Sequence, residues 1–214
     1  MYFPNVIQQA SCSSRVVTVT GNGKIAVRPN YAQLQIEVST KGKEVSEAQQ
    51  ENANIMNQVI QSIIALSIPR EAIQTAVYNI FPNYDYIDGK QVFRGYEVKN
   101  AITVKITDMN KIGTVIDTAV LNGANHVSAM QFRIENADIY YQQALNLALQ
   151  NAQMKARTIA DTMHLILNPQ PLEIIEESNA EPVMYRALDL ASISTPIEQG
   201  QIVINAAVRV KFQY

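Results

Sequence analysis

The sequence has one cysteine, Cys12, among 214 residues, and its charges nearly cancel. A single cysteine cannot form an internal disulfide, so the chain is not a small scaffold held together by disulfides. Lys and Arg number 17 against 19 Asp and Glu, a formal net charge of -2. Such a balance produces no strong positive field to attract phosphate backbones or anionic lipid, and we expect no nucleic-acid partner.

Long apolar runs and export signals are also missing. No stretch approaches the roughly 18 apolar residues that a membrane-spanning helix requires, and we expect no transmembrane helix. Residues 1–14 lack the basic start and the apolar run of a secretory signal, and we expect them to form a flexible tail. Localisation stays open on this evidence, because the protein either remains in the cytoplasm or has lost a leader.

No arrangement of side chains typical of catalysis or metal binding is found in the sequence. His126 and His164 have no further ligand residues at metal spacing. Gly21 and Gly23 lack the rest of a phosphate-binding loop, and we interpret them as turn residues. Cys12 has no histidine nearby, and catalysis through it would need a distant base such as His126. We expect no catalytic residue, no cofactor and no metal.

Hydrophobic residues make up 47% of the chain and charged residues 17%, a composition typical of globular proteins. Two β-rich runs come first, and we interpret them as a strand pair joined through Gly21, Gly23 and Pro29. Apolar side chains then recur at helical spacing from Val45 to Leu66, and a β-branched run follows from Ile73 to Ile80. The opening unit is predicted to be ββαβ.

The second half of the chain repeats these patterns and adds a long helix. Alternation predicts strands at 101–107 and 130–134 around a helix at 112–120, with Gly123 as its left-handed cap. An alanine-rich stripe predicts a helix over 138–163, and strands are expected at 172–176 and 202–212. The fold class is therefore α+β, with antiparallel or mixed sheets from ββαβ and βαβ units, two shorter helices and one long Ala-rich helix.

Two segments are candidates for contacts with a partner. Phe81–Tyr96 is rich in tyrosine and contains the hairpin signal Asp88–Gly89, which favours a hairpin tip over a catalytic pair formed by Asp85 and Asp88. A loop of about 25 residues, Glu177–Gln201, is long for a compact domain. Aromatic side chains favour interfaces, although packing within the hairpin explains them equally well. The candidate interaction residues are Tyr84, Tyr86, Phe93, Tyr96, Met184 and Tyr185.

Several segments in order resemble the SIMPL-domain family: VTGNGKIAVRPNYAQLQIEV, SIPREAIQTAVYNIFPNY, RGYEVKNAITVKITD, NGANHVSAMQF and QGQIVINAAVRVKF. Asn30, Gln143 and His164 depart from the usual family residues. The resemblance implies a single domain over 15–214, with two subdomains, the second around 98–135, as the alternative. It also implies frequent export to the cell envelope, a link to stress tolerance and, in some relatives, assembly into large rings, but no established reaction.

Three functional hypotheses follow, from different classes. The first is a non-enzymatic scaffold or interaction protein that associates with itself, as a homo-oligomer, through its sheet edges, the hairpin Phe81–Tyr96 and the loop Glu177–Gln201. The second is a binding module that holds a small apolar ligand or peptide between sheet and helices. The third, which the sequence favours least, is a hydrolase or redox enzyme using Cys12 or the histidines.

Overall fold

The computed structural model describes residues 15–177, 183–185, 197 and 199–214; for 183–185 only the backbone is described. The predicted α+β class is confirmed, with two antiparallel sheets and three α-helices in this part of the chain. The chain divides into two compact units. Of the described residues, unit 1 comprises 15–27, 136–177, 183 and 203–214, and unit 2 comprises the others. The predicted tail, residues 1–14, lies outside the described residues.

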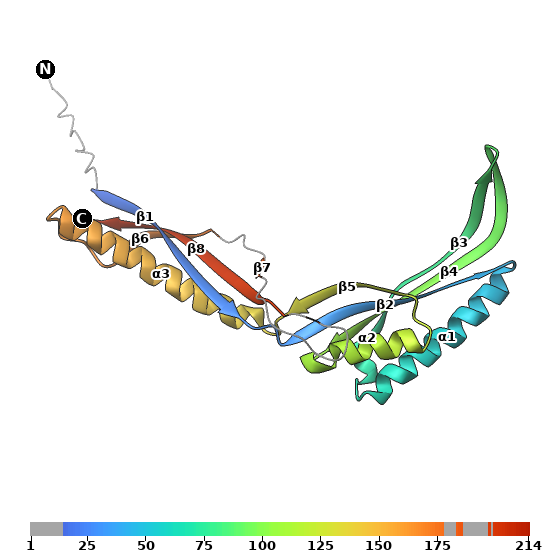
Figure 1. Cartoon of the computed structure of the whole chain (residues 1–214). Helices are drawn as coiled ribbons and strands as arrows, with labels where there is room; N and C mark the ends of the chain where they lie inside the picture. The colour runs from blue at the N-terminus through green and yellow to red at the C-terminus, as the bar shows by residue number, and fades with distance from the viewer. Residues whose placement is uncertain (1–14, 178–182, 186–196, 198) are drawn as a thin grey trace, which may run out of the picture. The chain divides into compact units, whose positions relative to one another are not determined.

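Unit 1 is a sheet packed against one long helix (Figure 1). Its strand order is β1 (Val16–Val27), β8 (Gln201–Gln213), β6 (Pro171–Glu176), and β7 (Val183–Tyr185) also pairs with β8. Helix α3 (Ala137–Thr162) lies against β1. Alternate residues of β8, from Ile202 to Phe212, are buried, as expected for a strand with one covered face.

The interpretation of Gly21 and Gly23 as turn residues was wrong. Both lie inside β1, and β1 and β2 belong to different sheets instead of forming a strand pair. Their physical role is to let α3 approach the strand, because a Cβ on Gly21 would lie 2.0 Å from the carbonyl oxygen of Ala148. The alanine stripe of α3 packs at this contact; the buried alanines are Ala144, Ala148, Ala152, Ala156 and Ala160.

Unit 2 is a four-stranded antiparallel sheet with two helices on one face (Figure 1). Its order is β3 (Ile73–Ile87), β4 (Lys90–Ile106), β2 (Tyr31–Gly42), β5 (His126–Arg133), and the helices are α1 (Val45–Ala65) and α2 (Ile112–Leu121). Short 3-10 turns, Arg70–Ala72 and Met109–Lys111, precede β3 and α2. Every second residue of β2 from Ala32 to Thr40 is buried, so one face of the sheet points to the helices and the other does not.

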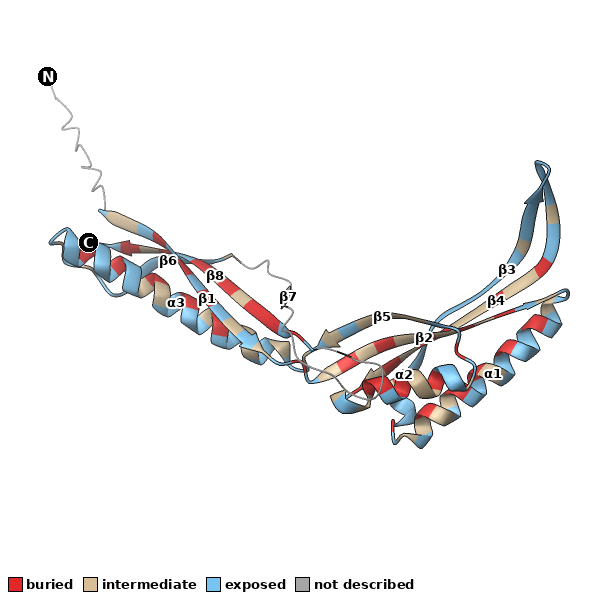
Figure 2. Cartoon of the chain, in the orientation of Figure 1, coloured by how far each residue is buried: buried red, intermediate tan, exposed pale blue. Residues whose placement is uncertain are grey.

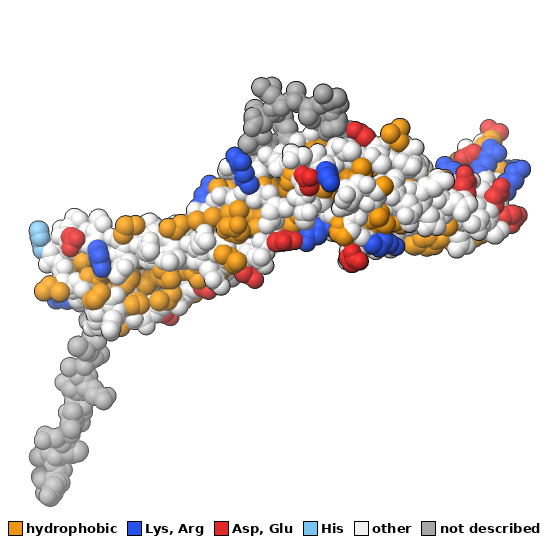
Figure 3. Space-filling view, turned by 90° about the horizontal axis from the view of Figure 1, so that it is seen from below, with side chains coloured by type: hydrophobic (Ala, Val, Ile, Leu, Met, Phe, Trp, Pro, Cys, Tyr) orange, Lys and Arg blue, Asp and Glu red, His pale blue; other side chains and the backbone are white. Residues whose placement is uncertain are grey.

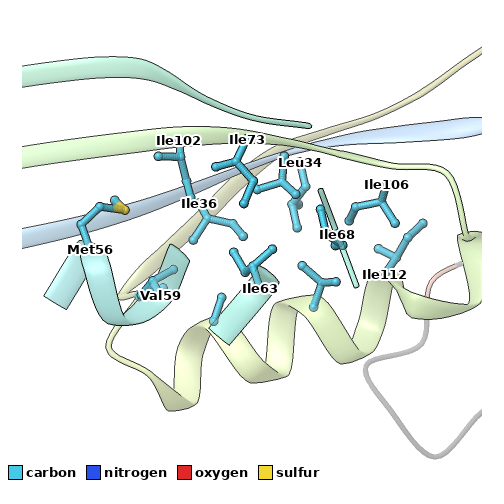
Figure 4. Packing of buried hydrophobic residues seen from close by; sticks show 14 of the residues in the cluster. Leu34, Ile36, Met56, Val59, Ile63, Ile68, Ile73, Ile102, Ile106 and Ile112 are labelled. Atoms are coloured by element: carbon cyan, nitrogen blue, oxygen red, sulfur yellow. The ribbon is translucent and has the colours of Figure 1, made fainter. Parts of the chain in front are cut away.

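The core of unit 2 lies between the sheet and its helices. Side chains from both layers point toward one another there (Figure 4). The largest fully buried ones include Leu34, Ile36, Ile63, Ile102 and Ile106. Because these side chains occupy the space between the layers, no observation favours the hypothesis of a small apolar ligand held between sheet and helices.

Asn52 is the polar exception in the buried stripe of α1. Its side chain is fully buried, and Nδ2 donates hydrogen bonds to the carbonyl oxygens of Val38 (2.8 Å) and Val98 (3.2 Å). Its Oδ1 has no hydrogen-bond partner among the described residues. The helix is thereby tied to the backbones of β2 and β4 at one point inside the core.

All three helices end in a residue with left-handed backbone geometry. The residues are Ser67 (φ 67°), Gly123 (φ 105°) and His164 (φ 54°), each directly after its helix cap. The left-handed cap predicted at Gly123 is confirmed. None of the described helices is long and apolar enough to cross a bilayer, in agreement with the prediction.

Candidate interaction surface

Strands β3 and β4 form one long hairpin whose tip was predicted from sequence. The pairing runs from Ile87 opposite Lys90 back to Ile73 opposite Val104. Asp88 (φ 50°) and Gly89 (φ 75°) make the turn, and positive φ at both positions is the geometry of a type I′ hairpin turn. The expected hairpin at Asp88–Gly89 is therefore confirmed.

The outer part of this hairpin leaves the four-stranded sheet. Pairing between β2 and β4 ends at Gly42 opposite Tyr96, so residues 90–95 of β4 pair with β3 alone. Gly95 (φ 117°) packs tightly here, because a Cβ on it would lie 2.3 Å from the carbonyl oxygen of Gly42. Beyond this point the hairpin is a two-stranded ribbon, and most of its side chains are exposed (Figure 2).

Three of the predicted interaction residues form an aromatic cluster at the base of this ribbon. The ring of Phe93 contacts Tyr84 edge-on at a centroid distance of 5.5 Å and Tyr96 at 5.2 Å. Tyr86 stands apart from these contacts, with 76% of its surface exposed. Met184 belongs to β7, and its side chain, like that of Tyr185, lies outside the described part of the structure. The interaction role of these residues stays a prediction.

The acidic residues of the ribbon have structural roles. The carboxylate of Asp85 pairs with the guanidinium of Arg94 at 2.7 Å, across the hairpin. Asp88 is the first residue of the tip turn. Both observations agree with the hairpin interpretation that the sequence favoured over a catalytic carboxylate pair.

Sheet edges were among the expected contacts, but the sequence did not show which strand has a free edge, and in unit 2 it is β3. Among the described strands of unit 2, β3 is terminal and pairs only with β4. The run from Ile73 to Phe81 contains no Lys, Arg, Asp or Glu. Its exposed side chains include several large apolar ones: Val77, Tyr78, Ile80 and Phe81. Proteins usually protect such edges with charges, prolines or bulges, and here Pro82 and one register shift between Thr75 and Val77 are the protection.

Each histidine lies at the end of an element of its own unit. His126 is exposed at the start of β5, and His164 is exposed at the end of α3. Cys12 lies outside the described residues. Within the described part of the chain, no three His, Cys, Asp or Glu side chains are grouped so that they could hold a metal ion.

Comparison with known proteins gives one family. The model of the SIMPL family, described as a protein of unknown function (DUF541), matches residues 17–212. The chain is 27% identical over 202 residues to "Uncharacterized protein YggE" of Escherichia coli strain K12, which covers 92% of this chain and 82% of that protein. The 26 kDa periplasmic immunogenic protein of Brucella melitensis is 29% identical over 210 residues, covering 92% and 84%.

A human protein also matches part of the chain. Interleukin-1 receptor-associated kinase 1-binding protein 1 of Homo sapiens is 24% identical over 180 residues, which is 81% of this chain and 64% of that protein.

Proposed function

The chain belongs to the SIMPL family, a family of unknown function, and on this premise we propose that it is a non-catalytic interaction protein that associates with copies of itself through the edge of β3. One observation carries the proposal: the run from Ile73 to Phe81 is a terminal strand, uncharged, with large apolar side chains exposed. A strand edge of this kind is a template for pairing with another strand.

A second copy of the same strand is a suitable partner. The unpaired N–H and C=O groups along the edge would form ladder hydrogen bonds with those of the partner. An antiparallel pair of identical strands can be two-fold symmetric, and a run without charges places no like charges opposite each other. The exposed Tyr78 and Phe81 would then be covered by apolar side chains of the other copy.

Unit 1 offers a further apolar surface that supports association. Apolar side chains run along its surface in Figure 3. Large exposed apolar residues of unit 1 come from α3, its C-terminal cap and β6: Ile139, Leu147, Met154, Met163, Leu172 and Ile174. Large exposed apolar areas are unusual on proteins that remain monomeric. The predicted contact loop, Glu177–Gln201, falls mostly outside the described residues.

A place in the cell envelope is proposed on weaker support. One relative carries the name of a periplasmic protein, and the family resemblance points in the same direction. A role in stress tolerance rests on that resemblance as well. Fractionation of cells expressing the native gene, followed by immunoblotting, tests the envelope assignment, and recovery in the cytoplasmic fraction alone would contradict it.

Light scattering coupled to size exclusion, over a hundredfold range of concentration, tests self-association. We expect a mass that is a multiple of 23.8 kDa. Tyr78→Lys should shift the mass toward the monomer, because it places like charges near each other across the paired edge. Leu121→Lys is the matched control, since Leu121 is 85% exposed at the end of α2 and away from the edge. A monomer at all concentrations, or an unchanged mass for Tyr78→Lys, would contradict the proposal.

A further inference from the structure

We propose that the open face of the unit 2 sheet binds a small sugar acid, of the hexuronate class, in a polar hollow above β2, β4 and β5. The hollow has a volume of about 150 Å³, and its lining residues are Gln33, Gln35, Thr103, Ala129, Gln131 and Arg133. It lies on the side of the sheet opposite the helices, because Gln33 and Gln35 alternate with the buried Leu34 and Ile36. This binding function is separate from self-association and does not depend on it.

An irregularity of β5 lies at the hollow. Gln33 is opposite Gln131 and Gln35 is opposite Ser128, so β5 places two residues, Ala129 and Met130, where β2 places one. Ala129 has φ 48°, a left-handed geometry that a residue with a Cβ adopts only at an energetic cost. Bulges and strained residues of this kind concentrate at functional sites, where they redirect neighbouring side chains.

The side chains above the strands have hydrogen-bonding groups that the protein leaves unused. Gln33, Gln35 and Thr103 are half-buried, and their side chains have no hydrogen-bond partner among the described residues. A glutamine amide presents donors and an acceptor, and a threonine hydroxyl is both. A ligand that matches this set must itself donate and accept at neighbouring positions, as the hydroxyl groups of a sugar do.

The positive charge of Arg133 in the hollow favours a ligand with a carboxylate group. Arg133 donates to the side-chain oxygen of Gln131, and no carboxylate within the described ranges lies at ion-pair distance from it. Lys105, on the same face, is already engaged, since it pairs with Glu135 and lies 4.7 Å from the centre of the Tyr31 ring. No acidic residue lines the hollow. A guanidinium without an acidic partner binds a carboxylate through two parallel hydrogen bonds.

The volume of the hollow matches a single ring. A cavity of about 150 Å³ is large enough for one six-membered ring. Because this hollow is open to solvent, the substituents of a larger ring can extend outward. A six-membered ring with several hydroxyls and one carboxylate therefore meets the three requirements of hydrogen bonding, charge and size.

Ligand-observed NMR with sodium glucuronate as the probe tests the proposal. Saturation-transfer difference measures binding to the full chain, and it works whether the protein is a monomer or a large assembly. We expect a Kd near the millimolar range, typical of a small polar ligand in an open site. Arg133→Gln should raise the Kd at least tenfold. Arg209→Gln is the matched control, because Arg209 is an exposed arginine of unit 1 that pairs with Glu177, and its Kd should equal that of the wild type.

Two further comparisons separate the hydroxyl contacts from the charge. Thr103→Val keeps the shape of the strand and the charge of Arg133, and we expect the Kd to rise severalfold. Acetate and glucose, each tested alone, should bind at least tenfold more weakly than glucuronate. No saturable signal, equal affinity in Arg133→Gln, or acetate binding as tightly as glucuronate would overturn the proposal.

Discussion

A Cβ atom on Gly23 would lie 1.8 Å from the carbonyl oxygen of Ala144, so strand β1 and helix α3 are in direct backbone contact. Polar groups fix the same contact from the side, since the backbone N–H of Asn22 donates to Oδ1 of Asn151 at 3.1 Å. No side chain larger than hydrogen has room at position 23. Two of the eight glycines of the chain, Gly21 and Gly23, thus position the only helix of the described unit 1.

Substitution of Gly23 should therefore destabilise unit 1. We expect Gly23→Ala to lower the free energy of unfolding by about 3 kcal/mol, because the new methyl group meets backbone atoms that cannot move independently. Urea unfolding followed by circular dichroism measures the change. Gly89→Ala is the control: it has the same chemistry at φ 75° with nothing within 4 Å, and it should cost about 1 kcal/mol. Equal costs at the two sites would contradict the close contact.

Substitutions at the ends of α2 and α3 should change the free energy of unfolding in opposite directions. His164 occupies the left-handed position after α3, where its N–H donates to the carbonyl of Asp161 at 3.2 Å. Gly123 occupies the same position after α2. His164→Gly should raise the free energy of unfolding by about 1 kcal/mol, because glycine has no Cβ strain there. Thermal unfolding measures this gain.

The opposite substitution at the end of α2, Gly123→Ala, should lower the free energy of unfolding. Gly123→Ala introduces a Cβ at φ 105° that would lie 2.5 Å from Cγ2 of Ile55. We expect a loss of about 2 kcal/mol from strain and contact together. If His164→Gly instead destabilised the chain, the histidine would have a role in the cap beyond its backbone.

Substitution of the buried Asn52 by aspartate should lower the free energy of unfolding by an amount that depends on pH. In Asn52→Asp, a buried carboxylate would face the carbonyl oxygens of Val38 and Val98, and its pKa should rise above the ordinary 3.9. The penalty, about 3 kcal/mol at neutral pH, should then shrink as pH falls through the raised pKa, where the group is neutral. Urea unfolding at pH 4 and pH 7 measures this, with Asn52→Leu as the control whose cost does not depend on pH. Equal penalties for Asn52→Asp at both values would contradict it.

Tyr141 and Glu176 couple α3 to the end of β6. The Tyr141 hydroxyl donates to the Glu176 carboxylate, and this hydrogen bond, followed by burial and the negative charge, raises the pKa of Tyr141 above 10.0. Its stabilising effect is complete below the unfolded pKa of about 10 and is lost as pH rises through the folded value. Glu176→Gln should lower the pKa of Tyr141. The absorbance of ionised tyrosine, taken as the difference from Tyr141→Phe, measures it, and an unchanged pKa would exclude the coupling.

The helices and most strands were predictable because their signals are local. The stripe from Val45 to Leu66 places apolar side chains on one helical face, whatever that face packs against. The turn at Asp88–Gly89 likewise depends on the φ values that these two residues accept. Periodicity therefore located the three helices and the hairpin tip, but it placed the start of β4 at residue 101 instead of Lys90 and the start of β5 at residue 130 instead of His126, and it did not predict β7.

Relations between distant segments could not be predicted in this way. Nothing near Gly21 in the sequence shows that Ala148 will lie against it, so a glycine that allows close packing looked like a turn glycine. Alternation in β1 indicates a covered face but not which strand is its neighbour. Whether β3 has a free edge is decided by the order of all four strands in the sheet. The polar hollow depends on the same strand order, because its lining residues come from three strands.

The pairing of β1 with β8 also has a consequence for biosynthesis. The N–H of Tyr214 donates to the carbonyl of Arg15 at 3.0 Å, so the sheet of unit 1 joins the first and last described residues. Most of unit 2, residues 28–135, is contiguous and leaves the ribosome well before β8. During translation β1 is made before β8, so Val19, which is buried in the folded chain, stays exposed to solvent until β8 is made. Unit 2 can fold during this interval. Nascent chains arrested before residue 201 should therefore contain a folded unit 2 and an unformed unit 1 that chaperones can bind.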